Sequence, residues 1–207
     1  NAMRNLSIPV ITMEKYGFDC PGVDILFDYE KGGYMATRHL IECGHRRIGC
    51  VAGKQSFHVT MQRLNGYKKA LEESGISYDP DLVYFGDYTM ESGYEAFSYI
   101  LGQKVTAIFS MNDEMAFGIY RAARLYGVSI PEDISIIGFD NVPFADVMQV
   151  PLTTIGVPVI EMGKKLGEKV VDLIDNKEKL KEREEILYTP RLLVRGSTKS
   201  IPPVTVI

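Results

Sequence analysis

The chain has few of the features that mark membrane, exported or nucleic-acid-binding proteins. Its 207 residues carry 23 basic and 27 acidic side chains, a formal net charge of -4, and no basic cluster. A mildly acidic chain of this kind is a poor nucleic-acid binder on its own. No apolar run approaches a membrane span, and no charged start followed by an apolar core predicts export. The length suits one large domain or two small lobes.

Cysteine is scarce, with Cys20, Cys43 and Cys50 the three in the sequence. Their number is odd and none forms a Cys-x-x-Cys pair, which favours a reduced, cytoplasmic compartment. Cys43, His45 and Cys50 match no zinc spacing, and Cys50 is expected to point into the core from its strand. We therefore predict no metal site.

The motifs of two common enzyme classes are missing as well. Gly53-Lys54-Gln55 is not a P-loop, because the earlier glycine and the Ser/Thr after the lysine are absent. No serine lies in a Gly-x-Ser-x-Gly elbow, so a hydrolase triad lacks its nucleophile. The sequence predicts neither catalysis nor a cofactor.

Two short apolar runs, each followed by acidic and amide residues, carry the most information. Residues 106–110 lead into Asn112 and Asp113, and residues 134–139 lead into Asp140. Such runs are typical of buried parallel strands, and helical spacing between them predicts a strand–helix–strand unit. Because ligands bind outside the carboxyl ends of strands in open α/β sheets, Asn112 and Asp140 are expected to face one crevice.

The rest of the chain alternates in the same manner. The expected strands cover residues 8–13, 23–27, 47–53, 82–85, 151–155, 185–188 and 192–194, and the expected helices cover residues 31–43, 59–74, 89–101 and 158–174. The charged run at 177–185 favours a solvated loop or hairpin, and the tail after Gly196, which has no period, is expected to be partly disordered. The predicted class is α/β with Rossmann-like parallel sheets.

Five fragments in order resemble a known family. They are Gly44-His45-Arg46-Arg47-Ile48-Gly49, Arg63-Leu64-Asn65-Gly66-Tyr67, Asn112-Asp113, the run from Ile130 to Asn141, and Pro151-Leu152-Thr153-Thr154-Ile155. Together they resemble the effector-binding part of the lactose/galactose repressor (LacI/GalR) family. The resemblance implies the fold of periplasmic sugar-binding proteins, in which two Rossmann-like lobes are joined by crossing strands.

The resemblance also implies a division into lobes. Residues 3–45 and 156–189 would form the N-terminal lobe, and residues 46–155 and 190–207 the C-terminal lobe. Family members begin with a helix-turn-helix segment and open the first lobe with three strands and two helices, which do not precede Met3 here. We therefore expect a complete C-terminal lobe, a partial N-terminal lobe, and DNA binding only through a helix-turn-helix absent from this chain.

Three residues of the expected complete lobe are candidate ligand contacts. The forked guanidinium of Arg63 suits vicinal hydroxyls, carboxylates or phosphates, Asp140 can accept from two sugar hydroxyls, and Tyr88 can stack on a sugar or a base. Each has an alternative role. Arg63 could form a surface ion pair, Asp140 could cap the turn at Pro143, and Tyr88 could be a lone surface ring. The resemblance favours the ligand roles.

Asn112 and Asp113 compete for two roles, since one of them must cap the helix that follows. We assign Asn112 to the ligand and Asp113 to the cap. From the partial lobe, the resemblance adds Met13, Glu14 and Phe27 as crevice-lining residues. Glu14 occupies a position where aspartate is more usual, and the resemblance names no particular sugar.

Apolar side chains on the complete lobe predict a homodimer interface. Phe117 and Tyr120 project from one helix, and Phe144, Val147 and Met148 follow the second central strand. Together they are more apolar than an isolated surface needs, and the resemblance implies pairing through the same elements. Phe117 could pack inside the lobe instead.

The sequence thus indicates an effector-sensing domain of a transcriptional regulator. It would bind a small sugar-like ligand in the cleft between the lobes and shift the population towards a closed arrangement. A periplasmic-type sugar transport receptor is the first alternative, which the lack of an export signal disfavours. An α/β nucleotide- or sugar-processing enzyme is the second, which would need a general base or phosphate loop.

Overall fold

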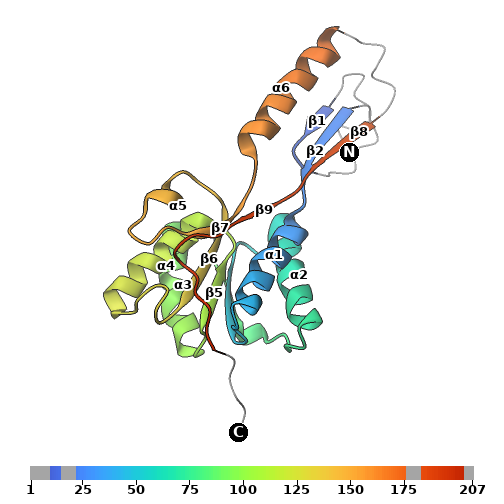
Figure 1. The fold of residues 1–207 in the computed structure, drawn as a ribbon. Coiled ribbons are helices and arrows are strands. Elements are labelled where there is room, and N and C mark those ends of the chain that lie inside the picture. The colour runs from blue at the N-terminus through green and yellow to red at the C-terminus, as the bar shows by residue number, and fades with distance from the viewer. Residues whose placement is uncertain (1–9, 15–21, 176–182, 203–207) are drawn as a thin grey trace. The chain divides into compact units, whose positions relative to one another are not determined.

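A computed structural model describes residues 10–14, 22–175 and 183–202 (Figure 1). Their strands are β1 (Val10–Thr12), β2 (Gly22–Phe27), β3 (Ile48–Ala52), β4 (Val83–Phe85), β5 (Ala107–Ser110), β6 (Ser135–Asp140), β7 (Thr153–Gly156), β8 (Arg183–Tyr188) and β9 (Arg191–Leu193). Their helices are α1 (Tyr29–Glu42), α2 (His58–Glu73), η1 (Pro80–Leu82), α3 (Met90–Gly102), α4 (Asp113–Tyr126), α5 (Phe144–Val147) and α6 (Val159–Asp175). The predicted alternation of strands and helices is confirmed.

The chain forms two compact units. Unit 1 comprises Asn1–Asp28 and Val157–Pro190, and unit 2 comprises Tyr29–Gly156 and Arg191–Ile207. Unit 2 has a six-stranded sheet in the order β4-β3-β5-β6-β7-β9, in which only the β7–β9 pair is antiparallel. Helices α1 and α2 cover one face of this sheet, and α3 and α4 cover the other (Figure 1). The carboxyl ends of β5 and β6 therefore lie at one edge, as predicted.

Helix α1 belongs to unit 2, so the division comes after Asp28 rather than at residue 45 as we expected. Two glycines allow its backbone to lie directly against α2. A methyl group on Gly33 would lie 2.2 Å from the carbonyl oxygen of Arg63, and one on Gly66 would lie 2.0 Å from that of Glu30. Such close helix packing tolerates no larger residue at either position, and this contact attaches α1 to unit 2.

The segment from Gly196 to residue 202 packs against neighbouring strands, although it has no periodic pattern. The Ser197 side chain is fully buried; its hydroxyl accepts from the Thr153 amide at 2.7 Å and donates to the Ile136 carbonyl at 2.6 Å. The Ile201 amide donates to the Cys43 carbonyl at 2.8 Å. Polar groups satisfied by neighbouring strands thus hold a segment that has no periodic pattern. Residues 203–207 lie outside the described part of the chain.

Unit 1 contains the parallel sheet β1-β2-β8 and helix α6, which packs on β2. Among the described residues of α6 only Met162 is buried, whereas Ile160 and Ile174 are 76% and 66% exposed. The charged run at 177–185 was expected to be a solvated loop or hairpin; its residues 183–185 begin β8, and residues 177–182 are not described. No helix in the described ranges is long and apolar enough to cross a membrane.

Candidate functional site

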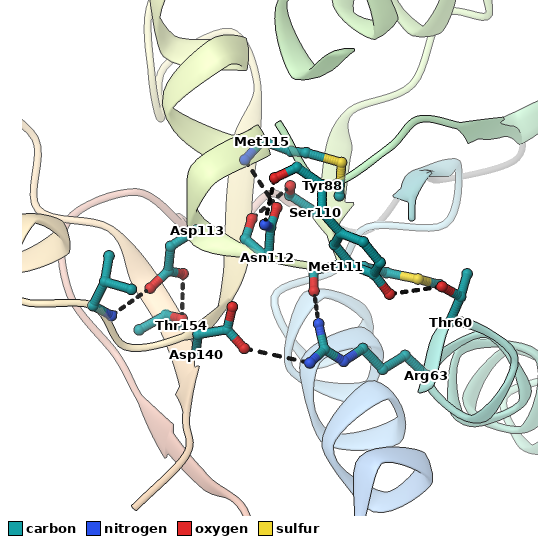
Figure 2. A network of polar contacts seen from close by, with 11 residues as sticks. Thr60, Arg63, Tyr88, Ser110, Met111, Asn112, Asp113, Met115, Asp140 and Thr154 are labelled. Carbon is teal, nitrogen blue, oxygen red and sulfur yellow. Dashed lines mark hydrogen bonds and ion pairs between the residues drawn. The ribbon is translucent and has the colours of Figure 1, made fainter. Parts of the chain in front are cut away.

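Arg63 is part of a polar network in unit 2, where it contacts Met111 and Asp140 (Figure 2). It extends from α2, and its side chain is 7% exposed. Nη1 donates to the carbonyl oxygen of Met111, and Nη2 lies 3.3 Å from Oδ1 of Asp140. The guanidinium carbon lies 3.8 Å from the ring centroid of Phe139 and 5.0 Å from that of Tyr29. The network thus joins α2 to the ends of β5 and β6.

The Arg63 guanidinium has more donors than partners. Its Nε is buried and has no hydrogen-bond acceptor among the described residues. Burying a charge is costly unless it is paired, and an unsatisfied buried donor costs about 1–3 kcal/mol.

Asp140 ends β6 at a sharp change of chain direction. Its φ is 106° and that of Asn141 is 58°, both in the left-handed region. Oδ1 faces Arg63, while Oδ2 has no partner among the described residues and the side chain is 35% exposed. Burial raises the pKa of Asp140, although the charge and hydrogen bond of Arg63 pull the pKa down. Helix α5 begins after Pro143 with no side-chain cap, so Asp140 does not have the capping role.

Tyr88 is part of the same network rather than a lone surface ring. Its hydroxyl lies 2.7 Å from Oγ1 of Thr60, and its ring stacks on Phe57 with centroids 6.2 Å apart. The ring also lies 5.8 Å from the guanidinium carbon of Arg63. A methyl group on Gly53 would lie 2.0 Å from the Tyr88 ring, so the glycine makes room for it. The aromatic wall next to Arg63 is therefore built from two loops.

The structure reverses the capping roles of Asn112 and Asp113. Oδ1 of Asn112 accepts from the Met115 amide at 2.9 Å, so Asn112 is the N-cap of α4, and its amide group donates to the Tyr88 carbonyl. The fully buried Asp113 carboxylate instead accepts from the Thr154 hydroxyl at 2.6 Å and from the Val142 amide at 2.9 Å. Burial raises the pKa of Asp113 to about 6.

The assignment of Asp113 to the cap was therefore wrong, and its carboxylate ties α4 to the segment after β6. Asn112 stays a predicted ligand contact with much of its hydrogen-bonding capacity already used. Met13, Glu14 and Phe27 lie in unit 1, where Met13 is exposed and Phe27 is buried. Their ligand roles also stay predictions.

Sequence reasoning missed several residues of the network. Thr60 lies one helical turn before Arg63, which places both on one face of α2, and that spacing could have identified it. Phe139 directly precedes Asp140 in an apolar run. Nothing in that run indicates that the Phe139 ring would pack against the guanidinium of Arg63. The Met111 carbonyl is a backbone group that no residue pattern indicates.

The predicted dimer residues form part of a groove of about 880 Å³ on unit 2. Phe117, Tyr120, Phe144 and Met148 line it, whereas Val147 is not among its lining residues. Phe117 is 6% exposed and meets Phe144 edge-to-face with centroids 5.3 Å apart. Phe117 thus packs within unit 2, while Phe144 and Val147 are 57% and 72% exposed.

The cysteine and histidine residues weighed as metal ligands have other surroundings. Cys50 is fully buried in β3, as expected from the sequence. The ring nitrogens of His45 lie 2.9 Å from Oγ1 of Thr106 and 3.0 Å from Oγ of Ser135. Among the described residues, no group of three or more His, Cys, Asp or Glu side chains is arranged to hold a metal ion. Cys20 lies outside the described ranges.

Comparison with known proteins assigns the family. The family model described as "Periplasmic binding protein-like domain" matches residues 37–198. The structure of a LacI family transcriptional regulator from Enterococcus faecium with bound ribose is similar with a TM-score of 0.83 and 33% identity, over 94% of this chain and 71% of that one. The chain belongs to the LacI family of periplasmic-binding-protein-like domains. The resemblance found in the sequence is thereby confirmed.

Other transcriptional regulators are similar over most of the chain. The repressor PurR of Pasteurella multocida is 39% identical over 199 residues, which cover 94% of this chain and 58% of the relative. The regulator DegA of Bacillus subtilis is 36% identical over 178 residues, 86% of this chain and 52% of the relative. The cellobiose complex of the regulator CelR has a TM-score of 0.80 and 34% identity, over 90% of this chain and 58% of that one. The chain thus spans less than three fifths of the length of these three relatives.

Proposed function

We propose that this LacI-family chain is the effector-sensing part of a transcriptional regulator and binds a small sugar-like molecule without transforming it. The observation that carries the proposal is the Arg63 guanidinium, which has more N–H donors than partners among the described residues and lies beside the Asp140 carboxylate, whose Oδ2 has no partner among them. A fork of donors next to an acceptor matches the mixed donor and acceptor character of neighbouring sugar hydroxyls.

The aromatic surroundings support the same ligand class. Tyr88 and Phe57 stack beside Arg63, and such rings can cover the apolar face of a sugar. The relatives with bound ribose and bound cellobiose are named as regulators, which supports binding rather than turnover. In the proposal, Asn112, Met13, Glu14 and Phe27 complete the contacts, and ligand binding favours one arrangement of the two units.

The proposed output is control of DNA binding in the cytoplasm by a helix-turn-helix segment outside this chain. Relatives such as PurR of Pasteurella multocida are named HTH-type repressors, which supports this role. We also propose that two copies pair through Phe144, Val147 and the groove beside them, because Phe144 and Val147 are strongly exposed.

The proposal is tested by binding. Isothermal titration of the chain with ribose and cellobiose, followed by a thermal-shift screen of further sugars and nucleosides, should yield a ligand that is recovered unchanged. Chemical turnover of that ligand would favour the enzyme alternative. Reading the gene upstream of Met3 separates the others, since a helix-turn-helix there supports a regulator and an export signal supports a transport receptor.

A further inference from the structure

Arg195, just beyond β9, makes three side-chain contacts to the segment that joins β6 to β7. Nη2 donates to Oδ1 of Asn141 at 2.7 Å, Nη1 donates to the Leu152 carbonyl at 2.8 Å, and Nε lies 3.0 Å from Oδ1 of Asp146. The Arg195 side chain is 17% exposed, whereas that of Asp146 is 71% exposed, so the contacts to Asn141 and Leu152 are the better shielded from water. A planar fork that holds three points of one segment fixes its shape more firmly than any single contact.

The held segment begins at the candidate ligand site. Asn141 directly follows Asp140, and both have positive φ values, 106° for Asp140 and 58° for Asn141. Non-glycine residues keep such conformations only where their surroundings hold them. The Arg195 contact holds the Asn141 side chain, and Asp113 holds the next amide, that of Val142, at 2.9 Å. The position of the Asp140 carboxylate against Arg63 depends on this turn.

The same segment forms a wall of the apolar groove. The Phe144 ring packs edge-to-face on Phe117 of α4, and the Val150 carbonyl accepts a hydrogen bond from Tyr120 at 3.0 Å. Between these contacts the segment folds on itself, with Ala145 and Leu152 fully buried and joined by a backbone hydrogen bond of 2.8 Å. One folded segment therefore connects Asp140 to the groove.

We infer that Arg195 is a positioning residue. It holds the segment between β6 and β7 and so fixes the position of the Asp140 carboxylate relative to Phe144, which lines the groove. The inference rests on the proposed function only in treating Asp140 as a ligand contact. Loss of the Arg195 contacts would release the turn at Asp140 and the groove wall together, while the sheet behind them stays intact.

The test uses the full chain without any ligand. Arg195→Met removes all three contacts, and Asn141→Gly removes one of them with a residue that adopts φ 58° freely. Arg191→Met is the matched control, because Arg191 is an exposed arginine on β9, four residues before Arg195. Two quantities are measured in each variant: the pKa of Asp140 by NMR of its carboxyl carbon, and amide hydrogen exchange along the chain.

In Arg195→Met we expect the pKa of Asp140 to fall towards its ordinary value, because the burial that raises it weakens; a weaker Arg63 contact acts in the opposite direction, but burial is the larger cause. The pKa of Asp87, which hydrogen bonds from Thr89 and Ser92 hold low, should not move. Hydrogen exchange should rise about tenfold or more in residues 141–150 but not in β5. Asn141→Gly should give a smaller change in the same direction, and Arg191→Met none.

Two results would overturn the inference. One is an unchanged Asp140 pKa together with unchanged exchange in residues 141–150. The other is exchange that rises equally in β5, which would make Arg195 a general stabiliser of unit 2. If Arg195→Met does not fold, the Asp140 pKa and the amide exchange of residues 141–150 are measured in Asn141→Gly instead, and the same two results there would overturn the inference. Failure of the proposed function is a separate result, because it appears as a parent chain that binds no sugar.

Discussion

Replacing Arg63 by methionine should separate its role in ligand binding from its role in the fold. Methionine keeps the apolar contact with Phe139 but removes every donor. Two of the five guanidinium N–H groups are used, one at the Met111 carbonyl and one at Asp140; of the other three the one on Nε is buried, which leaves those on Nη1 and Nη2 for a ligand. Hydrogen bonds from a charged group contribute about 1.5–3 kcal/mol each. The loss of even one or two corresponds to about 2 kcal/mol or more, roughly a thirtyfold weaker Kd.

The fold should weaken as well, for a reason that the structure supplies. Met111 is fully buried, so removing Arg63 leaves its carbonyl oxygen unsatisfied at a cost of about 1–3 kcal/mol. The Asp140 side chain is 35% exposed, so its carboxylate can form hydrogen bonds with water once Arg63 is removed. A loss of this size lowers Tm by several degrees, roughly 2–4 °C for each kcal/mol in a lobe of this length.

The assay is isothermal titration with the sugar found for the parent, well below the Tm of the variant. Arg63→Lys keeps the charge but not the fork and should lose less affinity, about fivefold. Arg38→Lys is the matched control, because Arg38 is an exposed arginine of unit 2 paired with Glu42 on α1. Equal affinity of Arg63→Met and the parent would refute the assignment of Arg63 to the ligand.

Further predictions follow from the same contacts. The folded pKa of Asp113 is about 6 against an ordinary 3.8, so the folded state holds this proton more tightly than the unfolded chain does. The contribution of Asp113 to stability is therefore fully present below about pH 4 and is lost, by about 3 kcal/mol, between about pH 4 and 6. Asp113→Asn should remove this part of the pH dependence in urea unfolding. Tyr88→Ala should weaken sugar binding less than Arg63→Met, and unchanged affinity would exclude stacking. Val147→Glu should convert a dimer to a monomer in light scattering with Tm unchanged, whereas a strictly monomeric parent at high concentration would contradict the pairing. Hydrogen exchange in residues 22–27 should be faster than in residues 135–140, because α6 buries one residue among those described; equal protection in a monomer would contradict this.

The edge of the sheet was predictable because it depends on strand order alone. Apolar runs that end in Asn112 and Asp140 predict parallel strands, and parallel strands bring their carboxyl ends to one edge. The parallel pairing of β5 with β6 confirms this edge, and Arg63 contacts Met111 after β5 and Asp140 at the end of β6. The choice between Asn112 and Asp113 as cap was not predictable, since both side chains can cap a helix. It depends on Gly138, where a methyl group would lie 2.2 Å from Oδ1 of Asp113.

The division of the chain shows a second limit. Tyr29–Glu42 has helical periodicity, which predicts a helix but not the sheet on which it packs. That choice depends on Gly33 and Gly66, two small residues on different helices whose contact appears only in the folded chain. The order of residues 197–201 likewise depends on distant partners such as Thr153 and Ile136, which no local pattern indicates.

The most direct test of the central claim is a titration of the ¹⁵N-labelled chain with ribose and cellobiose, monitored by amide NMR shifts, which detects weak binding. The account predicts that one of these sugars, or a relative of them, shifts amides around Arg63, Tyr88 and Asp140 more than any others in unit 2, and that Arg63→Met abolishes these shifts. Shifts confined to other parts of the chain, or equal shifts in the parent and Arg63→Met, would contradict it.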